Sequence, residues 1–358
     1  MEKNERFSNK IVSVSFILAC MIVYLHANNT RNYAYEYTIF GNIVIFIQRL
    51  MDYLQRVCVP MYFTISGYLF FRNFSINKIM EKYKRRIKSL VIPYIIWNTI
   101  SYLFFVALTM LPFVKGKINI EGVKFGLMPL IDAIINSRYS TLWFIQFLII
   151  FIVIAPIIFY MLRNKKIGCF VMSGIISLNI ITLTMRYDEI YSTTEFNIFN
   201  LIYDVSFFMI GAFLAMHCKN CVEVKNNRMT KISNYMIFIM IILAIFKTIL
   251  NEKIIYIRTL SYIFNIIFIA VLWEFADNFS FKNIRWWEKI AFFIYCTHMI
   301  ILLIIQKIVL IISKGNIYVG AVDYIISPIM CILIIIILAK GLKKHLPKTW
   351  SVITGGRG

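Results

Sequence analysis

Long runs of apolar residues, nearly free of charged side chains, recur along the whole chain. Runs of about 18 or more such residues are longer than most buried core helices and fit the ~20 residues that a helix needs to cross a bilayer. Hydropathy therefore predicts an all-α fold, a polytopic membrane bundle of about ten transmembrane helices. These lie near residues 11–27, 42–71, 89–112, 141–162, 167–185, 198–217, 234–250, 254–273, 288–312 and 320–342.

The basic residues between these helices predict their orientation. Lys and Arg number 25 in the two terminal segments and the loops on their side of the bundle, against 8 in the alternate loops. Because cytoplasmic loops carry the excess of Lys and Arg, both termini are predicted to be cytoplasmic. We expect one transmembrane domain, residues 1–342, followed by a short cytoplasmic tail, residues 343–358. An interfacial helix is expected near 128–136.

Composition supports this class. Of 358 residues, 60% are hydrophobic and 15% charged, against about 45–50% and about 25% in soluble domains, which excludes a soluble enzyme, a disordered chain and a small disulfide scaffold. A net charge of +21 would also suit nucleic acid, but no basic-aromatic nucleic-acid module is present. The excess instead matches cytoplasmic loops held against an anionic leaflet, so the expected partner is the lipid bilayer, with no nucleic acid.

The predicted span 42–71 differs from the others. At 1.5 Å per residue it would be about 45 Å long, whereas the hydrocarbon core is about 30 Å thick. It contains Arg49, Arg56 and Pro60, and a proline inside a helix removes a backbone donor and kinks or breaks it. Broken helices at membrane depth are tolerated where they face protein or a wet cavity. This span is therefore expected to line a site.

Ionisable residues inside predicted spans are candidates for function, because each is costly unless it is paired or hydrated. Lys247, Arg258 and Lys307 are expected to reach the interface. His26 and His298 have two interpretations: a histidine that is hydrogen-bonded to a carbonyl, or a group that transfers protons near neutral pH. The candidates are His26, Arg56, Asp204, Lys247, Arg258, His298 and Lys307.

No metal site is expected. Cys218 and Cys221 form a C-x-x-C beside His217, but a tetrahedral zinc site needs a fourth ligand, and we interpret the pair as reduced loop thiols. Sequence signatures of a serine nucleophile elbow, a glycine-rich phosphate loop and an H-E-x-x-H zinc site are also missing.

Several motifs, in order, resemble those of the acyltransferase-3 family of bacterial integral-membrane O-acyltransferases. The segment from Arg56 to Phe70, RVCVPMYFTISGYLF, is similar to the family's R-x-x-V-P-x-F-F-x-x-S-G-Y-L. The segment 83–97, YKRRIKSLVIPYIIW, is similar to the family's basic loop before P-Y-x-x-W. His26 closes the first span, LWF opens the fourth, Tyr295 and His298 lie in the ninth, and TGGR ends the chain.

The resemblance assigns roles to individual residues. His26 corresponds to the essential histidine that ends the family's R-x10-H motif, although Ser15 stands where that motif has arginine. The family's R-x-x-R corresponds to Arg85 and Lys88, with Arg86 beside them, and these three are the expected donor-binding residues. His26 and Arg56 are the expected catalytic residues, and the other candidates for the pocket are Ser15, Ser66, Trp143, Tyr295 and His298.

The resemblance implies transfer of an acyl group to a hydroxyl of an extracytoplasmic polysaccharide or glycolipid, at the bacterial cytoplasmic membrane. The expected acyl group is acetyl, from cytoplasmic acetyl-CoA. Acyl-CoA would be a substrate, and no bound cofactor is expected. The seven basic residues of 72–88 would hold its phosphates, although the positive-inside rule alone also explains them. His26 would act as general base or transient acyl carrier, and Arg56 would stabilise the oxyanion.

Two other functions fit the same sequence. A carrier or exporter of glycans or small molecules would use the same broken span and cavity without chemistry. A structural partner of a glycan synthase would not need histidine and arginine inside the membrane, so it is the least favoured.

Overall fold

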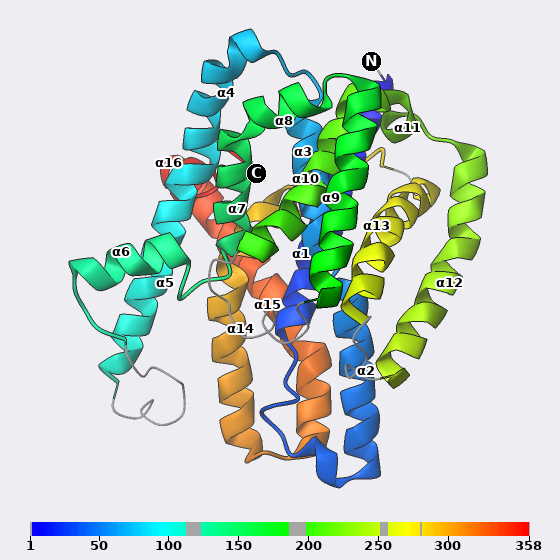
Figure 1. Cartoon of the computed structure of the whole chain (residues 1–358). Coiled ribbons are helices and arrows are strands. Elements are labelled where there is room, and N and C mark those ends of the chain that lie inside the picture. Colours follow the sequence, from blue (N-terminus) through cyan, green and yellow to red (C-terminus); the bar gives the residue numbers. More distant parts are fainter. Residues whose placement is uncertain (1, 112–122, 186–197, 251–256, 280, 358) are drawn as a thin grey trace.

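The computed structural model describes residues 2–111, 123–185, 198–250, 257–279 and 281–357. These ranges are almost entirely helical and contain no strand, which confirms the predicted all-α membrane bundle (Figure 1). The α-helices are α1 (Glu2–His26), α2 (Ile39–Gln55), α3 (Cys58–Phe71), α4 (Ile79–Arg86), α5 (Ile92–Thr109), α6 (Leu127–Asn136), α7 (Trp143–Val153), α8 (Ala155–Leu162), α9 (Lys165–Met185), α10 (Ile198–His217), α11 (Lys219–Glu223), α12 (Asn227–Leu250), α13 (Ile257–Phe275), α14 (Ala291–Ser313), α15 (Ile317–His345) and α16 (Pro347–Ile353). Short 3-10 segments are η1 (Tyr35–Tyr37), η2 (Ile76–Lys78), η5 (Ala276–Asn278) and η6 (Trp286–Ile290), and η3 (Ile87–Val91) is a turn of π-helix.

The long helices match the predicted spans. Within the described ranges, eight helices are long and apolar enough to cross a bilayer, and α7 with α8 passes the same criteria as a pair that is bent by 61°. These nine coincide with nine of the ten predicted spans, and α6 matches the predicted helix near 128–136. The outer end of 89–112 and the start of 254–273 include residues outside the described ranges.

The remaining predicted span, 42–71, is broken as expected. It consists of α2 and α3, which are separated at Arg56 and Val57. The break precedes Pro60, which lies in the first turn of α3. The N–H groups of a first turn have no partner within the helix, so a proline there costs no hydrogen bond.

Backbone contact between α3 and α10 fixes the centre of the bundle. A Cβ atom on Gly67 of α3 would lie 2.0 Å from the carbonyl oxygen of Phe208, and one on Gly211 of α10 would lie 2.0 Å from that of Thr64. Small residues allow such close approach between helices in a membrane. The crossing holds α3, which carries the family-like motif, in a fixed position.

The two ends of the bundle differ in composition. The N-terminus, α4, α8 and α11 lie at the same end, the upper end in Figure 1. The start of α2 and the turn between α14 and α15 lie at the opposite end. The basic segments predicted to share the cytoplasmic face thus share one end of the molecule.

The segment 343–358 packs back onto the bundle through α16. The indole N–H of Trp97 on α5 donates to the carbonyl of Ile353 over 2.9 Å. The ring of Trp350 lies 4.9 Å from that of Phe293 on α14 and is almost fully buried. These contacts place α16 against α5 and α14.

Candidate active site

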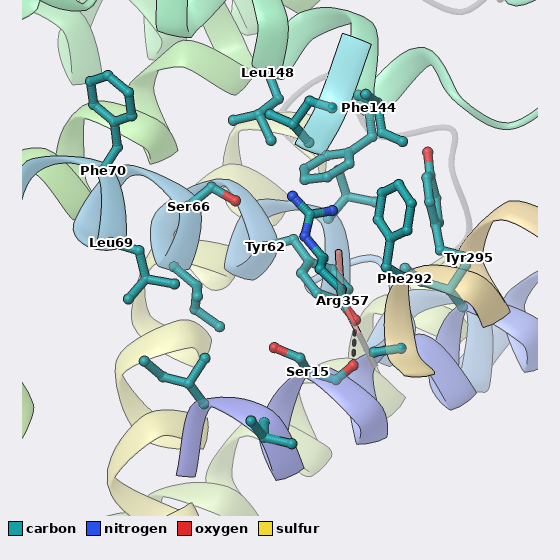
Figure 2. Close-up of a pocket in the computed structure, with 18 of the residues that line it drawn as sticks. Ser15, Tyr62, Ser66, Leu69, Phe70, Phe144, Leu148, Phe292, Tyr295 and Arg357 are labelled. Atoms are coloured by element: carbon teal, nitrogen blue, oxygen red, sulfur yellow. Dashed lines mark hydrogen bonds between the residues drawn. The ribbon is translucent and has the colours of Figure 1, made fainter. Parts of the chain in front are cut away.

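A cavity of about 440 Å³ lies between α1, α3, α7, η6 and α14, and we call it the inner cavity. Its walls are mostly apolar and aromatic (Figure 2). Its charged lining residues are Arg86, Glu288, Lys289 and Arg357. Arg86 comes from α4, Glu288 and Lys289 come from η6, and Arg357 comes from the segment after α16. The cavity is therefore mostly apolar with several cations in its lining.

A second cavity of about 340 Å³, the outer cavity, is more polar in character. Arg56, Asp204 and Arg258 supply charges to its lining. Aromatic rings and amides complete it, including those of Trp143, Tyr203, Asn179, Asn200 and Asn265. Such a mixture of flat rings and hydrogen-bonding groups suits a polar ligand with several hydroxyls.

Three helices contribute to both cavities. Val59 of α3 lines both of them. On α7, Trp143 faces the outer cavity and its neighbour Phe144 the inner one, and on α1 Leu25 and Ile22 divide in the same way. The two cavities therefore share a lining residue at Val59, and the outer end of α1 contributes to both of them.

His26, the last residue of α1, follows Leu25, which lines the outer cavity, but His26 itself lines neither cavity. Its ring centroid lies 5.2 Å from that of His298 on α14. His298 is fully buried, and its Nδ1 donates toward the carbonyls of Ile294 (3.1 Å) and Tyr295 (2.9 Å). That bonding leaves Nε2 as an acceptor, for which no hydrogen-bond partner is found in the described ranges. Two histidines from distant segments thus form a pair.

A buried polar network fixes the end of α1. The side chains of Asn29 and Gln48 hydrogen-bond each other over 2.8 Å, and Asn29 also donates to the carbonyl of Gly320 (2.8 Å) and to Asp323 (3.2 Å). The amide of Asn28 donates to Asp52 over 2.8 Å. Satisfied buried networks such as that of Asn29, Gln48 and Asp323 rigidify their surroundings, whereas Oδ1 of Asp52 has no hydrogen-bond partner in the described ranges. These contacts tie the helix end beside His26 to α2 and α15.

The predicted donor-binding residues occupy different positions. Arg86 lines the inner cavity and lies 5.7 Å from the ring of Phe70. Arg85 is exposed and pairs with Glu81 at 3.5 Å, and Lys88 is also exposed. Of the three, Arg86 has direct access to the cavity.

The remaining pocket candidates are near the two cavities. Ser15, Ser66 and Tyr295 line the inner cavity, and Trp143 lines the outer one. The hydroxyl of Tyr62 donates to the carbonyl of Ser15 (Figure 2). The described structure therefore brings every predicted pocket residue to one of the cavities or to the histidine pair.

Lys10, the basic residue of α1 nearest to Ser15, points elsewhere. Its ammonium lies 2.8 Å from Asp277, which also binds Arg6, and 3.9 Å from the ring centroid of Trp273. Lys10 therefore does not take the place of an arginine at position 15 in the cavity.

Arg258 differs from its expected role. It lines the outer cavity together with Arg56, rather than serving only to reach the interface. Lys247, the other residue near this turn, donates to Ser261 and lies 3.5 Å from the ring centroid of Tyr53.

Sequence reasoning missed several residues of the site. Asp52, Asp323 and Gln48 were detectable as polar groups within predicted spans, but Arg357 lies in the terminal segment, where no pattern predicts burial. Burial, and then the charge of Arg86, lowers the pKa of Arg357 to about 10, so it remains cationic at neutral pH. Arg357 supplies a positive charge to the inner cavity, whereas Ser15, which stands at the position of the family's arginine, is uncharged.

Nε2 of His217 donates a hydrogen bond to the carbonyl of Leu162 over 2.7 Å. Across the described part of the chain, no group of three or more His, Cys, Asp or Glu side chains is arranged to hold a metal ion.

Comparison with known proteins identifies the family. A family model described as an acyltransferase domain, acyltransferase-3, matches residues 16–340. No curated protein and no solved structure gave a match. The family match begins within α1 and ends within α15, and it includes both histidines, the whole lining of the outer cavity and most of that of the inner cavity. The chain therefore belongs to the acyltransferase-3 family, and it is a multi-pass membrane acyltransferase.

Proposed function

We propose that this acyltransferase moves an acetyl group from acetyl-CoA at the cytoplasmic face to a hydroxyl of an extracytoplasmic polysaccharide or glycolipid in a bacterial cytoplasmic membrane. The observation that carries the proposal is the pair of His26 and His298, which lies next to Leu25 of the outer cavity and Tyr295 of the inner cavity, two cavities of different chemistry. The proposal assigns the inner cavity to the donor and the outer cavity to the acceptor.

The inner cavity suits an acyl-CoA. Its mostly apolar lining fits a pantetheine arm with a short acyl group, and its cations suit phosphates. Tyr295, which lines the cavity and contacts the ring of His298, marks the direction in which the thioester would extend.

The proposed step is direct transfer. An imidazole nitrogen of His26 removes the proton of the acceptor hydroxyl while that oxygen attacks the thioester carbonyl carbon. The C–S bond then breaks, the new ester forms, and the CoA thiolate leaves and takes up a proton. His298 acts on His26 as a positioning residue, because its ring is held by two backbone carbonyls and lies against the catalytic ring.

The outer cavity suits a sugar. Trp143 offers a partly exposed ring face, and Asn200 and Asn265 offer amides for hydroxyl groups. Arg56 and Arg258 line the same space. In this arrangement Arg56 orients the acceptor or the developing oxyanion, because a planar guanidinium can contact several oxygens at once.

The sidedness of the proposal follows the distribution of Lys and Arg. Alkaline phosphatase fused after residue 80 or 225 is expected to be inactive, and fusion after residue 315 is expected to give an active, external enzyme. An active fusion at residue 225 would reverse the assignment of the two cavities.

Label transfer tests the reaction itself. Membranes containing the protein and supplied with radiolabelled acetyl-CoA are expected to place label in the polysaccharide or glycolipid fraction. Transport of a glycan without transfer of label would instead favour the carrier function that the same cavities would allow. A donor with a longer acyl chain serves as a comparison for the acetyl assignment.

A further inference from the structure

The end of the chain places an arginine in the inner cavity. After α16 the backbone turns through Gly355 and Gly356, which have φ of +62° and +75°. This left-handed conformation favours glycine, and a Cβ on Gly355 would also lie 2.4 Å from the carbonyl oxygen of Ser89. The turn therefore requires glycine, because of its backbone conformation and because of the close approach of Gly355 to Ser89. It places the guanidinium of Arg357 among the lining side chains (Figure 2).

Neither arginine of the cavity is neutralised by a carboxylate. The guanidinium of Arg357 lies 4.4 Å from the ring centroid of Phe292, as that of Arg86 lies over Phe70. No carboxylate in the described ranges lies within 4.0 Å of either one. Glu288, which also lines the cavity, accepts from the hydroxyl of Ser13 and the backbone N–H of Arg285.

The guanidinium groups of Arg86 and Arg357 lie in a mostly apolar space without a paired anion in the described part of the chain. Burying a charge is costly unless it is paired, and like charges in a low dielectric repel. Contact with aromatic faces offsets part of this cost. An anion bound between them would offset more, and a guanidinium matches the geometry of phosphate oxygens by forming two parallel hydrogen bonds.

We propose that Arg357 is a donor-recognition residue, which together with Arg86 binds a phosphate group of the acyl-CoA. The inference rests on the proposed function and deepens it, because it names the C-terminal segment as part of the donor site. It also gives α16 a purpose: the buried Trp350 anchors the segment so that Arg357 is held in the cavity.

Binding of CoA to the full-length protein in phosphatidylcholine nanodiscs tests this. Arg357→Gln is expected to weaken binding about tenfold or more, as loss of a charge-assisted bidentate contact would. Lys348→Gln is the matched control: it removes the same charge from an exposed position on α16, and its affinity should equal that of the wild type. S-acetylpantetheine, which lacks phosphate, should compete equally well for the wild type and Arg357→Gln.

Several results would overturn the inference. Unchanged CoA affinity in Arg357→Gln is one, and equal weakening by Lys348→Gln is another. Phosphatidylglycerol can also be added to the nanodiscs. If it abolishes CoA binding in the wild type but not in Arg357→Gln, the arginine binds a lipid headgroup instead. If Arg357→Gln does not fold, Arg357→Lys, which keeps the charge but not the fork, is expected to weaken CoA binding several-fold without affecting S-acetylpantetheine.

The two proposals can fail separately. A wild-type protein that transfers no label from acetyl-CoA would count against the proposed function. Normal transfer by the wild type, with the same KM for acetyl-CoA in Arg357→Gln, would remove the donor-recognition role alone.

Discussion

The rings of His26 and His298 lie 5.2 Å apart, although 271 positions separate them in the chain. One closes α1, and the other lies in the inner half of α14, fully buried. From sequence, each was a histidine inside a membrane span with a structural and a chemical interpretation. Their contact favours a role for the pair in proton transfer. Nδ1 of His298 bonds to the backbone, but its Nε2 has no hydrogen-bond partner in the described ranges and can accept a proton.

We expect His26→Ala to reduce acetyl transfer about 10²–10⁴-fold, the usual loss when a general base is removed. The protein should still insert and fold, because His26 is only partly buried and its removal leaves no charge behind. Rates of label transfer at matched expression provide the measurement. His345→Ala, at an exposed position at the end of α15, is the control, and near-normal transfer by His26→Ala would exclude the histidine mechanism.

Two substitutions of His298 separate chemistry from packing. Asparagine places an N–H where Nδ1 donates to the carbonyls, whereas glutamine places a polar group near Nε2. If Nε2 acts on His26, His298→Gln should retain several-fold more activity than His298→Asn. The opposite order, measured as kcat in the same assay, would indicate that His298 only stabilises α14.

Arg56→Lys should lower kcat/KM for the acceptor about tenfold or more, because an ammonium cannot contact several oxygens in a plane. Arg49→Lys on the same broken span is the matched control, since Arg49 is exposed and outside both cavities. Transfer rates at varied acceptor concentration measure the difference. Equal activity of the two variants would remove Arg56 from the site.

Replacing either glycine at the crossing of α3 and α10 should prevent folding. A Cβ at Gly67 or Gly211 would lie 2.0 Å from a carbonyl oxygen, so Gly67→Ala and Gly211→Ala should cost more than the about 1–3 kcal/mol of ordinary overpacking. The yield of monodisperse protein in size-exclusion chromatography reports this. Gly174→Ala on α9, where nothing lies within 4 Å, should leave the yield unchanged.

Stability should depend on pH through Glu223. Burial alone would raise its pKa, but hydrogen bonds from Arg72 (2.6 Å) and Tyr68 (2.8 Å), with the charges of Arg72 and Lys219, lower it overall. A lowered pKa means that its contribution is complete above the ordinary value of 4.5 and is lost as the pH falls below it.

Glu223→Gln is therefore expected to cost about 1–3 kcal/mol of unfolding free energy at neutral pH, and the difference should shrink below about pH 4.5. Thermal unfolding across this range measures it. Glu81→Gln, which breaks an exposed pair, should change little at any pH, and a Glu223 difference that is independent of pH would contradict the assignment.

The sequence by itself determined the membrane class, the spans and the residues of the family motifs. The hydropathy of a span is a sum over many residues, so a single atypical residue does not change the prediction. The family motifs can be identified because each is a short continuous segment of the chain. Even the break in 42–71 was predictable, because proline acts through its own backbone.

Tertiary structure alone decided which residues meet. His26 and His298 contact each other because α1 packs along α14, and Arg258 joins Arg56 because α13 closes the outer cavity. Arg357 lies in the inner cavity because the buried Trp350 and the turn at Gly355 and Gly356 fix the position of the segment that carries it. Such contacts join residues far apart in sequence, and they depend on helix packing that no local pattern of apolar and polar positions encodes.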